Sequence, residues 1–259
     1  MGKHTIIIVA AFVLGACVKD TKTTPAPEPI TIAEKLPSVE FSFKAVVDGK
    51  ALVANTGWYT NSSKDSFTVT KLNYYVSNIK LKKEDGSYYT EPESYHLIRH
   101  VEGNTSFTIA NVDEANYTGI EFLIGVDSLR NVSGAQTGAL DPANLMFWDW
   151  SSGYIFYKLE GQYRTTSMTD RSEFAIHIGG FGGKYPCLQT CSIAFPALLS
   201  AKKNNTAKIV LNTKVDEVFQ TPNKIGFDVY YAAPPDFAMF KSLSDNYKDM
   251  FAIDKVENQ

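Results

Sequence analysis

At 259 residues, with 44% hydrophobic and 20% charged side chains, the chain has the composition of a globular protein, which excludes an intrinsically disordered one. A formal net charge of −3 and the lack of a basic cluster exclude nucleic acid as an expected partner. The length suits one large all-β domain or two small ones.

The chain opens with a targeting segment. Lys3 precedes an almost wholly apolar run from Thr5 to Val13, which is too short to span a bilayer and is typical of a signal peptide. The run ends in Leu-Gly-Ala-Cys, which resembles a bacterial lipobox, so we expect residues 1–16 to be removed and Cys17 to carry a diacylglyceryl group. A buried N-terminal strand is the alternative interpretation.

The residues after the lipobox predict a membrane tether. Residues 17–38 lack a hydrophobic period and carry four prolines among Thr, Lys and Glu, a composition typical of an extended linker. Val18 stands where an aspartate often marks retention in the inner membrane. We therefore expect an extracytoplasmic lipoprotein whose lipid is inserted in the bilayer of the outer membrane, on its periplasmic face or at the cell surface. The folded domain is expected over residues 39–259.

Short alternating segments rich in aromatic and β-branched residues follow one another through this domain, with turn signals such as Asp48-Gly49 between them. Almost no helical period occurs before the tail. The pattern predicts an all-β fold, an antiparallel β-sandwich or barrel-like sandwich. The expected strands cover residues 41–47, 67–81 (one long or broken strand), 95–99, 107–112, 120–124, 154–160, 174–178 and 208–215.

Two segments depart from this alternation. In the tail, apolar residues recur at spacings of three and four, which predicts one or two short C-terminal helices packed on the sandwich. Residues 131–144 form a long loop without an obvious element, and loops of this length are usually functional or mobile. The apolar residues of the tail are Phe237, Phe240, Leu243, Tyr247, Met250 and Phe251.

Two of the three tryptophans, Trp148 and Trp150, directly follow the long loop. In an extended segment they would share one face, because side chains alternate along a strand. Core packing is the alternative role for such a pair, since aromatic side chains bury much area.

Among the histidines, His177 has the most suggestive surroundings. It alternates with the bulky residues of its strand, and its neighbours on the same face are the small Ala175 and Gly179, which leaves room for a ligand or a metal. A half-exposed surface histidine is the alternative. His96 and His100 are four residues apart, which is about 13 Å along an extended strand at nearly 7 Å for every two residues, too far to ligate one metal without other partners.

Enzyme motifs are missing from the sequence. It contains no H-E-x-x-H, G-x-S-x-G or P-loop pattern, and the glycine-rich segment 179–183 follows a strand in an all-β setting, where a turn or bulge explains it. We therefore expect a binding protein and not an enzyme.

The two remaining cysteines, Cys187 and Cys191, form an even pair in an oxidising compartment, and we predict a disulfide between them. Extended backbone would hold their Cα atoms about 13 Å apart, so the prediction requires a turn between them. Two buried thiols are the alternative.

Several motifs together resemble the MbnP-like family. They are Gly-Val-Asp-Ser at 125–128, Asn-Val-Ser-Gly at 131–134, Gly-Ala-Leu-Asp-Pro at 138–142, the W-x-W-x-x-G-Y-x-F segment at 148–156, His-Ile-Gly-Gly-Phe at 177–181, and segments 73–81 and 244–251. The resemblance runs from about Phe41 to the C-terminus.

The resemblance implies an extracytoplasmic copper-binding protein of all-β architecture. Copper would lie among histidines and a tryptophan that a di-haem cytochrome c peroxidase-like partner oxidises to kynurenine. By position, His177 matches the family's histidine motif, and Trp148 and Trp150 match its tryptophan pair. His96 is a second candidate ligand. Imidazole is a ligand type that copper accepts.

The chain also departs from the family pattern. Val132 stands where some relatives have histidine, and residues 254–257 carry no histidine where many close relatives have it. Two function classes therefore stay open. One is a copper-binding lipoprotein in copper uptake or handling, and the other is a metal-free β-sandwich binding or assembly module that has lost the copper site.

Overall fold

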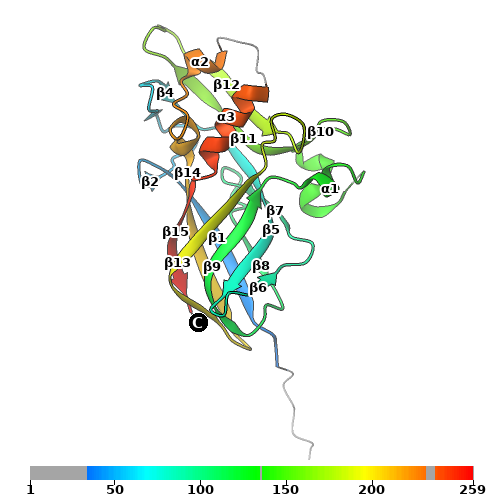
Figure 1. Cartoon of the computed structure of the whole chain (residues 1–259). Helices are drawn as coiled ribbons and strands as arrows, with labels where there is room; N and C mark the ends of the chain where they lie inside the picture. The colour runs from blue at the N-terminus through cyan, green and yellow to red at the C-terminus, as the bar shows by residue number, and fades with distance from the viewer. Residues whose placement is uncertain (1–33, 135, 232–236, 259) are drawn as a thin grey trace, which may run out of the picture. The chain divides into compact units, whose positions relative to one another are not determined.

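A computed structural model describes residues 34–134, 136–231 and 237–258 (Figure 1). The predicted signal peptide, Cys17 and nearly all of the tether lie outside these ranges. Within them, no helix combines the length and the apolar character needed to cross a membrane.

The smaller of two sheets has five strands and contains both the first and the last described strand. Its order is β15-β14-β1-β2, and β8 pairs with β1. The predicted turn at Asp48-Gly49 closes the β1–β2 hairpin, and both residues have positive φ, as such tight turns require. The strands are β1 (Ser38–Val47), β2 (Lys50–Ala51), β8 (Ser106–Ile109), β14 (Thr206–Lys214) and β15 (Phe251–Glu257).

The larger sheet has ten strands in the order β13-β9-β5-β11-β4-β3, with β6 and β7 on β5, and β10 and β12 on β11. Its pairings are antiparallel, whereas β1 and β14 of the smaller sheet run parallel. The strands are β3 (Tyr59–Thr60), β4 (Ser66–Phe67), β5 (Lys71–Lys83), β6 (Tyr88–Thr90), β7 (Tyr95–Arg99), β9 (Ala115–Ile124), β10 (Phe147–Asp149), β11 (Gly153–Arg164), β12 (Ser172–Gly179) and β13 (Gln189–Ala201).

The hydrophobic core fills the space between the sheets. Phe41 and Phe43 of β1 are buried, and Phe43 meets Tyr74 of β5 edge to face, with 6.2 Å between ring centroids and 75° between ring planes. Such aromatic pairs add to the stabilisation from buried area. The prediction of an all-β sandwich with short C-terminal helices is confirmed.

The 131–144 segment contains more structure than expected. The helix α1 (Ser128–Asn131) ends at the first residue of the segment, and two 3₁₀ turns follow within it, η1 (Gly138–Leu140) and η2 (Pro142–Asn144). The Tyr75 hydroxyl donates to the Ala139 carbonyl at 2.9 Å, and the Tyr154 hydroxyl donates to the Leu140 carbonyl at 2.7 Å. The segment therefore covers the outer face of the larger sheet, which explains why β5 is buried on both faces.

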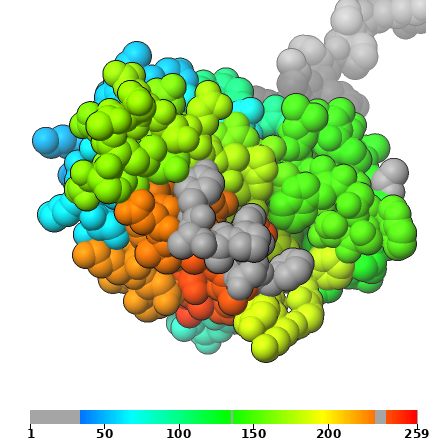
Figure 2. All heavy atoms as spheres, turned by 90° about the horizontal axis from the view of Figure 1, so that it is seen from above, coloured from blue at the N-terminus to red at the C-terminus, as the bar shows by residue number. Residues whose placement is uncertain are grey.

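The apolar stripe of the tail forms one helix, α3 (Phe237–Tyr247), as predicted. A second short helix, α2 (Phe227–Tyr231), lies before the stripe and follows the 3₁₀ turn η3 (Val215–Phe219). They lie at the upper end of the sandwich in Figure 1, and Figure 2 views that end with α2 and α3 in orange and red. The stripe does not continue as helix to Phe251, because the chain turns after Tyr247 and Phe251 begins β15.

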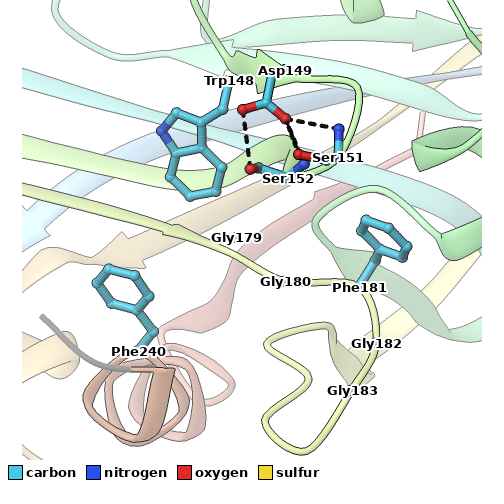
Figure 3. Close-up of a pocket in the computed structure, with 10 residues that line it drawn as sticks. All are labelled: Trp148, Asp149, Ser151, Ser152, Gly179, Gly180, Phe181, Gly182, Gly183 and Phe240. Carbon is cyan, nitrogen blue, oxygen red and sulfur yellow. Dashed lines mark hydrogen bonds between the residues drawn. The ribbon is translucent and has the colours of Figure 1, made fainter.

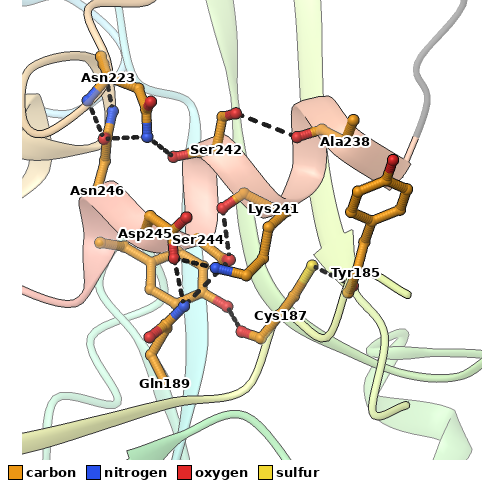
Figure 4. A network of polar contacts seen from close by, with 11 residues as sticks. Tyr185, Cys187, Gln189, Asn223, Ala238, Lys241, Ser242, Ser244, Asp245 and Asn246 are labelled. Atoms are coloured by element: carbon orange, nitrogen blue, oxygen red, sulfur yellow. Dashed lines mark hydrogen bonds and ion pairs between the residues drawn. The ribbon is translucent and has the colours of Figure 1, made fainter. Parts of the chain in front are cut away.

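Side-chain amides fix α3 to the rest of the domain (Figure 4). Asn246 donates to the Val218 carbonyl at 2.9 Å and accepts from the backbone N–H of Asn223 at 2.8 Å. Gln189 of β13 donates to the carboxylate of Asp245 at 3.0 Å. These contacts place the helix against the start of β13.

The predicted disulfide is wrong: Cys187 and Cys191 are free and buried. The required turn does not form, because residues 186–188 carry no turn and the chain enters β13 at Gln189. About four residues of extended chain then keep the thiols beyond bonding distance. Burial raises the pKa of Cys187 to about 11 and that of Cys191 to about 12, so both are protonated thiols.

Candidate functional site

His177 projects from β12 away from the core. Phe174, Ile176 and Ile178 are buried, which confirms the predicted alternation, and the side chain of His177 is 30% exposed. Its Nε2 lies 2.7 Å from Oε1 of Glu160, on the neighbouring strand β11. The strand register brings them together, because Glu160 pairs with Ala175 and Lys158 pairs with His177.

The electrostatics of this pair favour a neutral imidazole against an ionised carboxylate. Burial lowers the pKa of His177, and the positive charge of Lys158 lowers it further, although Glu160 opposes both. Burial alone would raise the pKa of Glu160, but the hydrogen bond with His177 and the charge of Lys71, at 3.7 Å, lower it overall. A neutral His177 donates its Nε2–H to Glu160, which leaves the Nδ1 lone pair available to an incoming ligand.

Lys158 ties this face to the segment that covers it. Its Nζ donates to the Leu145 carbonyl at 2.5 Å, and Arg99 donates to the Asn144 side chain at 2.7 Å. Burial lowers the pKa of Lys158. Leu145 has a left-handed φ of 59°, so two cationic side chains hold the segment at a bend just before Trp148.

The two tryptophans do not share a face, contrary to the expectation. Strand β10 ends at Asp149, and Trp150 lies in the following turn with 86% of its surface exposed. Trp148 instead packs over Gly179, where a Cβ would lie 2.5 Å from its Cζ3. Only glycine fits under the indole, and Gly179 lies two residues from His177 on the same face of β12.

A pocket of about 660 Å³ opens beside this contact. Figure 3 shows Trp148 and Phe240 on either side of the Gly179-Gly180 backbone, and Phe181 further along the chain, beyond Gly180. The volume is within the range of about 300–1,000 Å³ usual for small-molecule sites. The remaining lining residues are Asp149, Ser151, Ser152, Gly182 and Gly183.

His96 is not part of this site. Strands β12, β11, β5 and β7 are successive neighbours, and the register puts Arg99 level with His177. His96 is therefore about 14 Å from His177 across the sheet and a further three residues, about 10 Å, along it. The register also puts the side chains of His177 and Arg99 on the same face of the sheet. His96 is three residues before Arg99, so its side chain points to the opposite face. The expectation that both histidines approach one metal is therefore wrong.

His100 lies in the sandwich interior. Its Nε2 is 3.0 Å from the Tyr74 hydroxyl, which also bonds Thr213 at 2.7 Å. Burial lowers the pKa of His100 to about 4, so it is neutral at pH 7. It too is remote from His177, because Tyr74 faces the core.

Whether the residues fit a copper ion depends on the donor set. Over the described ranges, no group of three or more His, Cys, Asp or Glu side chains converges as a closed metal site needs. His177 and Glu160 nevertheless reproduce the arrangement of a metal-ligating histidine that donates its other N–H to a carboxylate. The residues fit attachment through one oriented imidazole and do not fit a closed multi-histidine centre.

Sequence reasoning missed Glu160, Lys158, Phe181 and Phe240 as site residues. The alternation of the 154–160 segment places Lys158 and Glu160 on its polar face, which was the available signal. Their pairing with His177 depends on strand register, which the sequence does not state. Phe240 reaches the pocket only through the position of α3.

The fold and this face define an all-β sandwich protein with one half-exposed histidine–carboxylate pair beside an aromatic pocket. The family model named MbnP matches residues 37–234, and the chain belongs to the MbnP family.

A likeness also exists to the solved structure of MbnP from Methylosinus trichosporium, with a TM-score of 0.50 and 15% sequence identity. It covers 85% of this chain and 98% of that chain, and at this identity it shows a shared fold. No curated protein matches the chain.

Proposed function

We propose that the protein is an extracytoplasmic copper-handling lipoprotein of the MbnP family, with His177 as its copper ligand. The observation that carries the proposal is the 2.7 Å pair of His177 and Glu160 on a half-exposed face. Imidazole is a ligand that copper accepts, and the carboxylate orients the ring and raises its basicity. With a single imidazole, the remaining coordination positions stay open to a donor from outside the described residues.

Trp148 is the tryptophan we propose for oxidation to kynurenine by a di-haem cytochrome c peroxidase-like partner. What supports this choice is its contact with Gly179, two residues from His177, whereas Trp150 lies in the exposed turn. Mass spectrometry of protein co-expressed with such a partner should show the gain of one oxygen and the loss of one carbon at Trp148. Modification at Trp150 alone would contradict the assignment.

Copper titration of the mature protein tests the metal proposal. We expect one copper ion per chain, with binding lost in His177→Ala and kept in His96→Ala. The second variant is a matched control, because His96 also bonds a glutamate at 2.9 Å. Equal binding by wild type and His177→Ala would refute the proposal.

Membrane anchoring through Cys17 is a proposal from the lipobox alone. Cys17→Ser should release the protein from the membrane fraction or block its processing, while the folded domain stays intact. An unchanged distribution between membrane and soluble fractions would exclude the lipid anchor.

A metal-free binding module is the second candidate function. The observation in its favour is the lack of a third converging ligand over the described ranges, next to a formed aromatic pocket. The same titration separates the two functions, because this candidate predicts no stoichiometric copper in the wild type.

A further inference from the structure

The pocket beside β12 is built from three aromatic side chains fixed on different elements. Trp148 comes from β10, Phe181 from the glycine-rich segment after β12, and Phe240 from α3 (Figure 3). Phe181 and Phe240 also pack against the hydrophobic core. Their rings are therefore held in place, with the glycine backbone as the floor between them.

The charge at this pocket has one sign. Among its ten lining residues, all in the described part of the chain, there is no lysine or arginine, and Asp149 is the charged one. The hydroxyl of Ser151 and the backbone N–H groups of Ser151 and Ser152 donate to Asp149 at 2.7–2.8 Å. The Ser151 hydroxyl above all lowers the pKa of Asp149 to about 2, so the carboxylate is ionised at any physiological pH.

Aromatic faces and a nearby carboxylate favour one kind of ligand. The negative ring faces attract cations, most strongly at tryptophan, and rings that surround a quaternary ammonium group are a known use of this attraction. A metal ion or a primary ammonium group would need several polar partners, which this largely apolar lining does not offer. A cation whose surface is made of methyl groups loses little hydration on entry.

We propose that the Trp148–Phe181–Phe240 pocket binds a trimethylammonium group. The rings contact its methyl groups, and Asp149 supplies the long-range negative potential. The ligand is either a free osmolyte such as choline or the headgroup of a choline lipid, which share this chemistry. The proposal does not involve His177, and it concerns protein in which Trp148 is the unmodified indole.

Isothermal titration of the mature protein with choline chloride tests the charge requirement. The matched control ligand is 3,3-dimethylbutan-1-ol, which has the same shape with a neutral carbon in place of nitrogen. We expect choline to bind and the neutral compound to bind at least about tenfold more weakly, because the neutral compound lacks the cation–π attraction to the rings. Equal affinities, or no binding of choline and no binding to the vesicles below, would overturn the proposal.

Variants test the residues. Trp148→Ala should weaken choline binding about 5–30-fold, whereas Trp58→Ala, at another exposed tryptophan that stacks on Arg171, should leave it unchanged. Asp149→Asn keeps the acceptor oxygen that bonds Ser151 and Ser152 but loses the charge, so it should weaken binding several-fold without unfolding the turn. His177→Ala should bind choline normally, which separates this site from the copper proposal. Normal choline binding by Trp148→Ala would contradict the assignment.

Vesicles distinguish the two sources of the group. Unlipidated protein, with Cys17 replaced, is sedimented with phosphatidylcholine or phosphatidylglycerol vesicles. Retention on phosphatidylcholine that free choline displaces identifies the lipid headgroup, and binding of choline in solution without retention identifies a free osmolyte.

Discussion

The described part of the chain contains two histidine–glutamate pairs of almost equal length in very different surroundings. His177 and Glu160 are 2.7 Å apart on the outer face of the larger sheet, beside a pocket. His96 and Glu91 are 2.9 Å apart, but the imidazole stacks flat on Phe107, with 3.6 Å between ring centroids and 4° between planes. His96 therefore helps to join β7 to β8, and His177 contributes little to packing.

The difference shows that a polar pair acquires its role from what covers it. Glu91 also accepts from the Ser94 hydroxyl at 2.5 Å, and that hydroxyl accepts from the backbone N–H of Ile79, so the His96 pair belongs to a continuous structural network. Around His177 the small neighbour Ala175 is exposed and leaves the face open on one side, while Trp148 covers Gly179 on the other. An open imidazole can exchange partners, whereas a stacked one is fixed.

A third histidine, bonded to a tyrosine hydroxyl, sharpens this comparison and carries the largest expected effect. Burial holds the pKa of His100 at about 4, below its ordinary value of 6.5, so the unfolded chain takes up the proton first as pH falls. The stability that neutral His100 contributes is therefore complete above pH 6.5 and lost towards pH 4. We expect this group to remove about 3 kcal/mol from the free energy of unfolding over that range.

Urea unfolding at pH 7 and pH 4 measures this loss. His100→Gln cannot titrate but can still bond Tyr74, so its stability should fall about 3 kcal/mol less than that of the wild type. An identical acid loss in both proteins would show that other groups cause it.

Removal of the ring under His96 tests the structural side of the comparison. Phe107→Ala should lower the free energy of unfolding by about 2–3 kcal/mol, because Phe→Ala in a full core costs about 3–5 kcal/mol and Phe107 is partly exposed. His177→Ala, on the open face, should cost less than about 1 kcal/mol. Urea unfolding of both variants at pH 7 checks the prediction, and equal losses would break the comparison.

Neutral carboxylate replacements test the two pairs directly. If copper binds His177, Glu160→Gln should weaken it about 10–100-fold, as is typical for the loss of a carboxylate that orients a ligating histidine. Glu91→Gln should leave copper affinity unchanged. Competition titration with a copper chelator gives both values, and a similar loss in the two variants would place copper elsewhere.

Strands with clean alternation could be predicted from the sequence. The segment at 95–99 matches β7, and the bulky even positions of β12 placed His177 on the correct face. Strand β13 was missed because Pro196 interrupts it and its register shifts between Ala194 and Leu199. Strand β15 was missed because charged residues such as Asp254 and Lys255 occupy this strand at the edge of the smaller sheet.

The site was less predictable than the fold. His177 was identified from its small neighbours, but its partner Glu160 depends on the register of β11 with β12. The assumption of an extended Trp148–Trp150 segment failed because the Asp149 carboxylate caps the turn that ends β10. The disulfide failed because the backbone between Cys187 and Cys191 stays extended, which local sequence did not reveal.

The parallel pairing of β1 with β14 has a consequence for the order of folding. Ser38 pairs with Thr206 and Val46 with Lys214, so the first strand of the domain needs a neighbour that is made 168 residues later. Pairing over such a separation is slow, because a long loop must close first. If the chain is exported as proposed, it emerges N-terminus first, and we expect β1 to remain unpaired on that edge until β14 has crossed the membrane. Chaperones that bind exposed strand edges would act during this interval.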